Sequence, residues 1–122
     1  MSTSKIIRAY GAAWNEGDEA QRRKLLEEAW SDDGVYCDPT ARVQSREALV
    51  AHIAGSQALF PGHRVELVSG VDEHDGLFRF AWEMRDPAGA TILEGVDFGV
   101  LAPDGRIGSI TGFFGPLPEL SA

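Results

Sequence analysis

The hydrophobic period of the chain changes at Pro61-Gly62, and this change constrains the fold more than any other feature of the 122 residues. Before it, apolar residues recur at helical spacing over about residues 4–15, 18–30 and 45–60. After it, apolar and polar residues alternate as they do in strands that bury one face. Helices followed by a run of strands predict an α+β fold with the helices on one face of a sheet.

The boundaries of the helical part have recognisable signals. Asp18 and Ser45 carry side chains that cap helix N-termini, so we expect the second and third helices to begin just after them. Between these two helices, residues 31–34 predict a turn and residues 35–37 a short strand. That strand ends before Pro39, because proline has no N–H to donate to a neighbouring strand.

The strand-rich part predicts a sheet that curves. An acidic turn at residues 72–76 interrupts the predicted strands, which cover about residues 64–69, 78–85, 91–101 and 106–114. Glycines inside these patterns mark places where the sheet would bend or bulge: Gly95, Gly99, Gly108 and Gly112. We therefore expect three N-terminal helices packed in the concave face of a strongly curved antiparallel sheet, a cone-shaped α+β barrel with one open end. The length fits a single domain over residues 1–122, with an ordered core at about 4–116 and a short C-terminal tail.

Charge, cysteine and histidine content exclude several function classes. The net charge is −8 and no basic stripe offsets it, so we expect no nucleic-acid partner. The single cysteine, Cys37, excludes an internal disulfide and is typical of a reducing, cytoplasmic compartment. The chain shows neither a leader peptide nor an apolar run of membrane-spanning length, so we expect no membrane partner. The three histidines have no paired spacing, and we expect no metal and no other cofactor.

Three side chains that could carry chemistry are predicted to face inward: Tyr10, Asp38 and Asp97. Tyr10 lies on the apolar face of the first helix, and Asp38 ends the first strand. Asp97 interrupts an apolar strand, where a carboxylate is costly unless it is protonated, paired or hydrogen-bonded. Each also has a structural interpretation, as a core tyrosine, a turn aspartate and a carboxylate that accepts backbone amides. The residues alone leave both interpretations open.

Three motifs resemble one known family. The first is Ile-Arg-Ala-Tyr at residues 7–10 with Trp-Asn-Glu-Gly-Asp at 14–18, and the second is Asp-Asp-Gly-Val-Tyr-Cys-Asp-Pro at 32–39. The third is a closing hairpin, with Gly-Val-Asp starting at residue 95 and Gly-Phe-Phe-Gly ending at 115. On these motifs the chain resembles the SnoaL-like and ketosteroid-isomerase branch of the nuclear transport factor 2-like superfamily.

The resemblance implies a role for each of the three inward residues. Asp38 matches the general base of the isomerases, and Tyr10 and Asp97 match the two donors that stabilise the enolate oxygen. The side chains expected around a small apolar ligand are Trp14, His52, Phe60, Trp82, Ile110 and Phe114. The isomerases also support the oxyanion tyrosine with a further tyrosine on the third helix, where this chain has His52 and Ile53.

The sequence is compatible with three functions. The first is general acid–base catalysis on an apolar carbonyl compound, by an isomerase or a polyketide-type cyclase. The second is a non-catalytic module that binds an apolar ligand or only dimerises; the resemblance implies a homodimer through the outer sheet face. The third is an epoxide hydrolase like the limonene-epoxide enzymes, which need an arginine between two carboxylates. Glu83 and Arg85 share a strand face, but Gly95 stands where that group has an arginine two residues before its aspartate.

Overall fold

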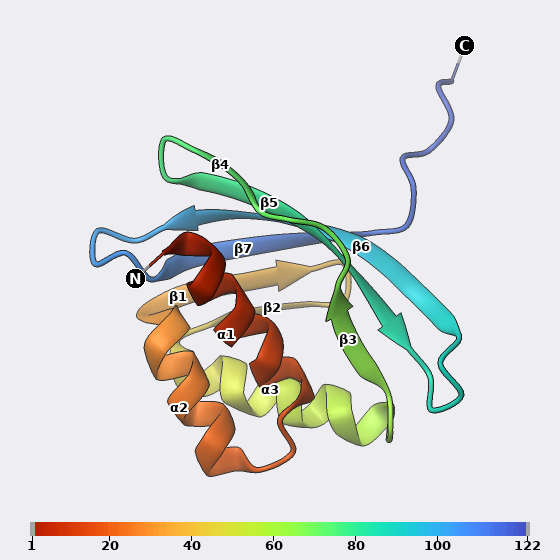
Figure 1. Ribbon diagram of the computed structural model, residues 1–122, viewed down its shortest axis with the longest axis horizontal. Helices are drawn as coiled ribbons and strands as arrows, with labels where there is room; N and C mark the ends of the chain where they lie inside the picture. The colour runs from red at the N-terminus through yellow and green to blue at the C-terminus, as the bar shows by residue number, and fades with distance from the viewer. Residues whose placement is uncertain (1, 122) are drawn as a thin grey trace.

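Three helices pack together against one side of a curved sheet in the computed structural model, which describes residues 2–121 (Figure 1). They are α1 (Thr3–Asn15), α2 (Glu19–Ala29) and α3 (Arg46–Leu59), close to the predicted ranges. Asp18 caps α2 by accepting from the Gln21 N–H, and Ser45 caps α3 in the same way. Among the described residues, no helix is long and apolar enough to span a membrane.

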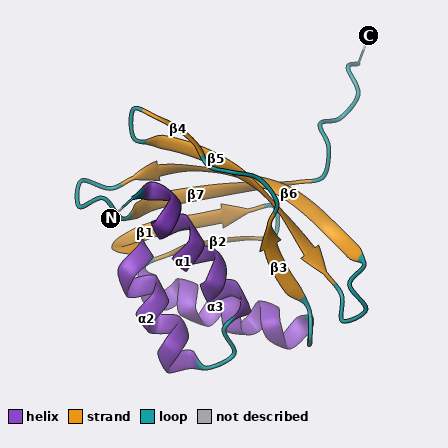
Figure 2. Cartoon of the chain, in the orientation of Figure 1, coloured by secondary structure: helices purple, strands orange, loops and turns teal. Residues whose placement is uncertain are grey.

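The sheet is mixed, and the antiparallel prediction is wrong for one pair of strands. The strand order is β2-β1-β7-β6-β5-β3, and β4 pairs with β5 (Figure 2). The strands are β1 (Trp30–Asp38), β2 (Ala41–Gln44), β3 (Arg64–Leu67), β4 (Asp72–His74), β5 (Leu77–Arg85), β6 (Thr91–Leu101) and β7 (Ile107–Phe114). Strands β1 and β7 run parallel, whereas every other pair is antiparallel. No hairpin links β1 to β7, so turn geometry does not set their direction.

Two segments predicted as turns belong to strands. Strand β1 begins at Trp30, and the register shifts between Trp30 and Val35, so residues 31–34 form an irregular part of the strand. Gly34 makes this possible, because a Cβ there would lie 2.2 Å from Nε1 of the buried Trp30 indole. The acidic segment begins as β4, and its turn is confined to Asp75 and Gly76, which both have positive φ.

The strand glycines make room for aromatic side chains on the concave face. Gly95 pairs with Trp82 and Gly99 with Phe78 across β5 and β6. A Cβ on Gly95 would lie 2.3 Å from the Trp82 ring, and one on Gly99 would lie 2.1 Å from the Phe78 ring. The indole and phenyl rings therefore lie directly over the backbone of β6. This packing keeps large apolar side chains inside a small curved sheet.

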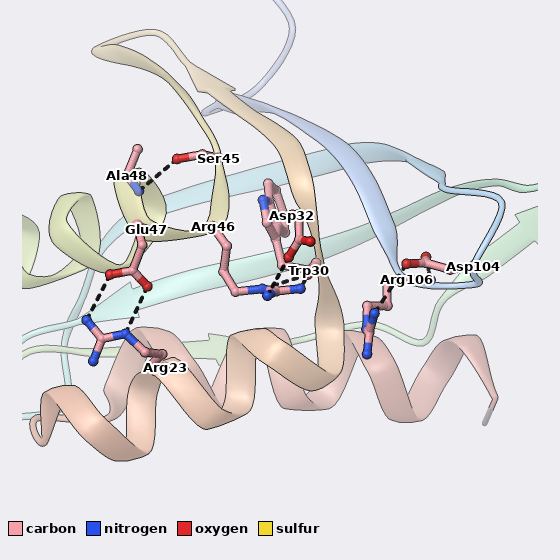
Figure 3. A network of polar contacts seen from close by, with 9 residues as sticks. All are labelled: Arg23, Trp30, Asp32, Ser45, Arg46, Glu47, Ala48, Asp104 and Arg106. Carbon is pink, nitrogen blue, oxygen red and sulfur yellow. Dashed lines mark hydrogen bonds and ion pairs between the residues drawn. The ribbon is translucent and has the colours of Figure 1, made fainter.

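A network of polar contacts links α2 to α3 and α3 to β1 (Figure 3). Arg23 on α2 makes two hydrogen bonds to Glu47 on α3, at 2.8 and 2.9 Å. Arg46 donates to the Trp30 carbonyl at 2.6 and 3.0 Å and pairs with Asp32 at 2.7 Å. The exposed Arg23–Glu47 pair contributes little stability. The half-buried bonds of Arg46 instead satisfy a main-chain carbonyl and fix where Trp30 enters the core.

Candidate functional site

A cavity of about 510 Å³ lies between the helices and the concave face of the sheet. Its wall is mostly apolar, with a few polar side chains that converge on it. The lining residues are Tyr10, Gly11, Trp14, Tyr36, Asp38, Thr40, His52, Gly55, Ser56, Leu59, Phe60, Val65, Leu67, Phe80, Trp82, Met84, Leu93, Asp97 and Phe114. The wall thus holds all three of Tyr10, Asp38 and Asp97.

Strand register explains why the two carboxyl groups meet. Asp97 on β6 is paired with Phe80 on β5 and with Gly112 on β7. Asp38 reaches Gly112 from the other side, since β1 pairs with β7 up to Cys37 and Thr111. Asp38, Gly112 and Asp97 therefore form one row across three neighbouring strands.

Gly112 sets the spacing between the two carboxyl groups. A Cβ at this position would lie 2.8 Å from Oδ1 of Asp97 and 3.7 Å from Cβ of Asp38. Any side chain at position 112 would therefore push into the space that Asp97 occupies. The absence of a side chain here lets both carboxyl groups enter the same cavity.

Asp97 is held in conditions that favour its protonated form. Only 6% of the residue is exposed, and the Trp82 indole N–H donates to its Oδ1 at 2.9 Å. The pKa of Asp97 is raised to about 7: burial is the main cause and the negative charge of Asp38 adds to it, while the Trp82 hydrogen bond acts in the opposite direction. The other oxygen, Oδ2, receives no hydrogen bond from the described residues. When Asp97 is protonated, its Oδ2 therefore remains available to donate a hydrogen bond.

Asp38 is held in the opposite state. Its Oδ1 accepts from the Thr40 amide and hydroxyl, both at 2.7 Å, and from the Ala41 amide at 3.0 Å. Its Oδ2 accepts from the Tyr36 hydroxyl at 2.5 Å. Burial alone would raise the pKa of Asp38, but the hydrogen bonds from Tyr36, Thr40 and Ala41 outweigh it and lower the pKa. Oδ1 therefore accepts the turn amides, as the turn interpretation expects, while Oδ2 is bonded to Tyr36, another residue of the cavity wall.

Tyr10 is a neutral phenol in the cavity wall. The residue is 2% exposed, and its ring stacks on Trp30 with centroids 5.5 Å apart and an interplanar angle of 17°. Burial raises the pKa of Tyr10, with the charge of Asp97 acting in the same direction. Within residues 2–121, no acceptor is found for the hydroxyl proton. Tyr10 can therefore donate to a ligand without breaking an internal hydrogen bond.

Five of the six side chains expected around an apolar ligand lie in the cavity wall. Trp14, His52, Phe60, Trp82 and Phe114 line the cavity. Ile110 does not; its side chain is fully buried in the core. It precedes Gly112 by two residues on β7, in the row of Gly99 and Tyr36 beneath the carboxyl groups. Ile110 thus lies on the inner face of β7, but in the packed core and not in the cavity wall.

Sequence reasoning missed two polar wall residues beside Asp38. They are Tyr36 and Thr40, the two side chains that hydrogen-bond its carboxylate. Strand alternation could have found Tyr36, because residues two apart face the same side of a strand. Thr40 follows the strand in the turn, where no periodic pattern applies.

The wall carries negative but no positive side chains. None of the lining residues is a lysine or an arginine. Arg85 does lie between two carboxylates, 3.1 Å from Glu83 and 3.5 Å from Glu66, but none of these three residues lines the cavity. Within residues 2–121, no group of three or more His, Cys, Asp or Glu side chains is placed to hold a metal ion.

Comparison with solved structures first defines the class of fold. A nuclear transport factor 2-like protein from Cytophaga hutchinsonii has a TM-score of 0.70 at 13% identity, over 95% of this chain and 92% of that one. A candidate SnoaL-like polyketide cyclase from Jannaschia sp. CCS1 has a TM-score of 0.65 at 18% identity, over 89% of this chain and 84% of that one. At these identities the likeness shows the fold alone, an α+β fold of the nuclear transport factor 2-like class.

The sequence then defines the family. The model of the SnoaL-like domain matches residues 7–110. A candidate isomerase of the SnoaL-like family from Agrobacterium tumefaciens is 33% identical, with a TM-score of 0.88 over 95% of this chain and all of that one. The chain belongs to the SnoaL-like family, which confirms the resemblance of its motifs. No curated protein matches the sequence.

Proposed function

We propose that the protein is a general acid–base enzyme that acts on an apolar carbonyl compound, as an isomerase or a polyketide-type cyclase. One observation carries this proposal. Two carboxyl groups share one cavity across Gly112, and their surroundings drive them to opposite protonation states. A pair of titratable groups whose pKa values are pushed apart is the arrangement that acid–base catalysis needs.

The chemistry assigns one role to each group. Asp38 takes a proton from the carbon next to a substrate carbonyl. The electron pair of that C–H bond forms a carbon–carbon double bond, and the π pair of the carbonyl moves to its oxygen. Tyr10 and protonated Asp97 donate hydrogen bonds to the resulting enolate oxygen. Asp38 then returns the proton to another carbon, which moves the double bond. In the cyclase version, the enolate carbon instead attacks a second carbonyl of the same molecule, and Asp38 returns its proton to the alkoxide oxygen that this attack forms.

The wall favours a neutral and apolar substrate. No cationic side chain lines the cavity to attract an anion, and Asp38 would repel one. A volume of about 510 Å³ and the rings of Trp14, Phe60, Trp82 and Phe114 suit a compound of several fused rings. The sequence similarity to the Agrobacterium candidate isomerase supports the isomerase version.

Turnover of a bicyclic β,γ-unsaturated ketone tests the proposal, since isomerisation creates a conjugated enone with its own ultraviolet absorbance. Asp38→Asn should lower kcat by about 10²–10⁴-fold, the usual contribution of a positioned base. Cys37→Ser is the matched control, because Cys37 neighbours Asp38 in β1 but does not line the cavity. A wild-type rate no faster than buffer, with this ketone and with a cyclisable polyketone, would contradict catalysis.

A non-catalytic binding module is the second candidate. The observation that favours it is the set of four hydrogen bonds to Asp38, because each of them lowers the basicity of the carboxylate. A fluorescent probe such as 2-naphthol separates the two candidates. Naphthol binding without turnover of any carbonyl substrate supports the module, and binding with turnover supports the enzyme.

We also propose that the protein forms a homodimer through the outer face of the sheet. Phe98, Val100 and Phe113 are 44–57% exposed on that face, and the two phenyl rings lie 6.0 Å apart in an edge-to-face pair. Apolar side chains grouped in this way are typical of an interface. Light scattering after size exclusion should give a dimer for the wild type and a monomer for Phe113→Arg. A monomeric wild type would contradict the proposal.

A further inference from the structure

Tyr36 is one of the polar residues that line the cavity. Its hydroxyl donates to Oδ2 of Asp38 at 2.5 Å, at the short end of the range for a hydroxyl on a carboxylate. The residue is 6% exposed, and its ring lies 5.5 Å from the Trp14 ring and 5.4 Å from that of His52. Helices α1 and α3 thus fix the phenol from two sides.

The hydrogen bonds of Asp38 leave one position for a substrate. An ionised carboxylate offers about two acceptor sites on each oxygen. Oδ1 already accepts from three donors, two from Thr40 and one from Ala41, and is fully used. Oδ2 accepts only from Tyr36, so it keeps one free lone pair. A proton taken from a substrate must therefore go to Oδ2, next to the Tyr36 hydroxyl.

We propose that Tyr36 is a positioning residue for Asp38, which holds Oδ2 so that its remaining lone pair points into the cavity. This inference rests on the proposed function, because it concerns the atom that acts as the base. Tyr36 itself neither gains nor loses a proton. When Asp38 takes the substrate proton on Oδ2, the phenol keeps its own hydrogen and stays in place.

The surroundings of Tyr36 keep it protonated during this step. Burial raises the pKa of Tyr36, and the negative charge of Asp38 adds to the effect. The other titratable groups nearby are Tyr10 on α1, His52 on α3 and Asp97 on β6. A phenol that stays neutral serves as a fixed donor, whereas a phenolate would repel the carboxylate it has to hold.

Titration of the Asp38 carboxyl carbon by NMR tests the inference without any substrate. Asp38→Asn assigns the signal in protein labelled with 13C-aspartate. Tyr36→Phe keeps the packed ring and removes the donor, so the Asp38 midpoint should move to higher pH. Tyr10→Phe is the matched control: it removes the other tyrosine hydroxyl of the cavity, which makes no hydrogen bond to Asp38, and should leave the midpoint unchanged. Equal midpoints in the wild type and Tyr36→Phe would overturn the inference.

A measurement on the wild type covers the case in which Tyr36→Phe does not fold. The Cζ signal of Tyr36 should shift with the same midpoint as the carboxyl signal of Asp38, because the two groups share a hydrogen bond. A Tyr36 Cζ chemical shift that does not change over the pH range in which Asp38 titrates would overturn the inference on its own.

Turnover then separates this inference from the proposed function. With the bicyclic β,γ-unsaturated ketone, Tyr36→Phe should move the acidic limb of kcat/KM to higher pH. It should also lower kcat about tenfold with little change in KM, because orientation of the base is lost rather than substrate binding. Turnover with an unchanged acidic limb in Tyr36→Phe defeats the inference alone. An inactive wild type defeats the proposed function, while the two NMR titrations still decide whether Tyr36 holds Oδ2.

Discussion

Asp38 and Asp97 approach Gly112 from two different strands, and the missing side chain of that glycine is what allows them to share one cavity. Their pKa values diverge because the two carboxyl groups have unlike partners. Asp38 accepts four hydrogen bonds, whereas Asp97 accepts one, from Trp82, in a more buried position. Near pH 6 the row therefore holds a carboxylate and a carboxylic acid side by side.

Gly112→Ala should disrupt this pair. The new methyl group would lie 2.8 Å from Oδ1 of Asp97, so the carboxyl group and the Trp82 indole bonded to it must move. We expect a loss of about 1–3 kcal/mol in the free energy of unfolding and a weaker affinity for 2-naphthol. Urea denaturation and fluorescence titration measure the two effects.

Gly17→Ala is the control for that substitution. A Cβ at Gly17 would meet no atom within 4 Å, and its φ is not positive. Both its stability and its naphthol affinity should stay close to the wild type. If Gly112→Ala behaved like Gly17→Ala, the close approach of Asp97 to Gly112 would be wrong.

The raised pKa of Asp97 predicts how stability depends on pH. The folded protein binds the Asp97 proton more tightly than the unfolded chain does, so this group stabilises the fold fully below its ordinary pKa. That contribution is lost as pH rises towards the folded pKa of about 7. An asparagine at position 97 cannot ionise, so Asp97→Asn does not lose this stability at high pH. The free energy of unfolding of the variant minus that of the wild type should therefore be larger at pH 8 than at pH 4. The difference should be on the order of a few kcal/mol in urea denaturation. An equal difference at both pH values would show that Asp97 titrates normally.

Asp38→Asn should make the cavity more receptive to an anionic oxygen. The substitution keeps the size of the side chain and removes the charge that raises the pKa of Asp97. The Asp97 midpoint in a carboxyl titration should therefore fall. At pH 5.5, where burial still keeps Asp97 protonated, 2-naphthol should bind more tightly than to the wild type. Weaker binding at that pH would mean that the Asp38 carboxylate itself contacts the probe.

Local patterns predicted most of the helices and strands, and the motif resemblance supplied the roles of the candidate site residues, but neither predicted how strands far apart in sequence pair. Helix caps at Asp18 and Ser45 and the alternation in β5 depend on neighbouring residues, and the structure confirms them. The parallel pairing of β1 with β7 depends on contacts between residues more than 70 positions apart, which no local period reports.

The polar detail of the site was less predictable for a related reason. Asp97 could be recognised as a candidate from the sequence, because burying a carboxylate in an apolar strand costs free energy. Alternation places Tyr36 on the same strand face as Asp38, but a tyrosine in a strand is ordinary, and only the structure shows that its hydroxyl bonds this carboxylate. Gly112 was predicted as a bend, yet what matters there is the space that it leaves for Asp97.

Trp82→Phe should raise the pKa of Asp97 while keeping the apolar wall of the cavity. The phenyl ring keeps most of the apolar wall, but the indole N–H that bonds Oδ1 at 2.9 Å is lost. That hydrogen bond lowers the pKa of Asp97, so its removal should raise the pKa further. Asp97 would then stay protonated to higher pH, and the pH at which 2-naphthol affinity declines should rise with it.

Trp14→Phe is the control, because it removes an indole from the same wall but no hydrogen bond from Asp97. Carboxyl NMR and naphthol fluorescence, both followed from pH 5 to pH 9, measure the two shifts. A decline in affinity at the same pH in wild type and Trp82→Phe would show that the protonated form of Asp97 does not hold the ligand.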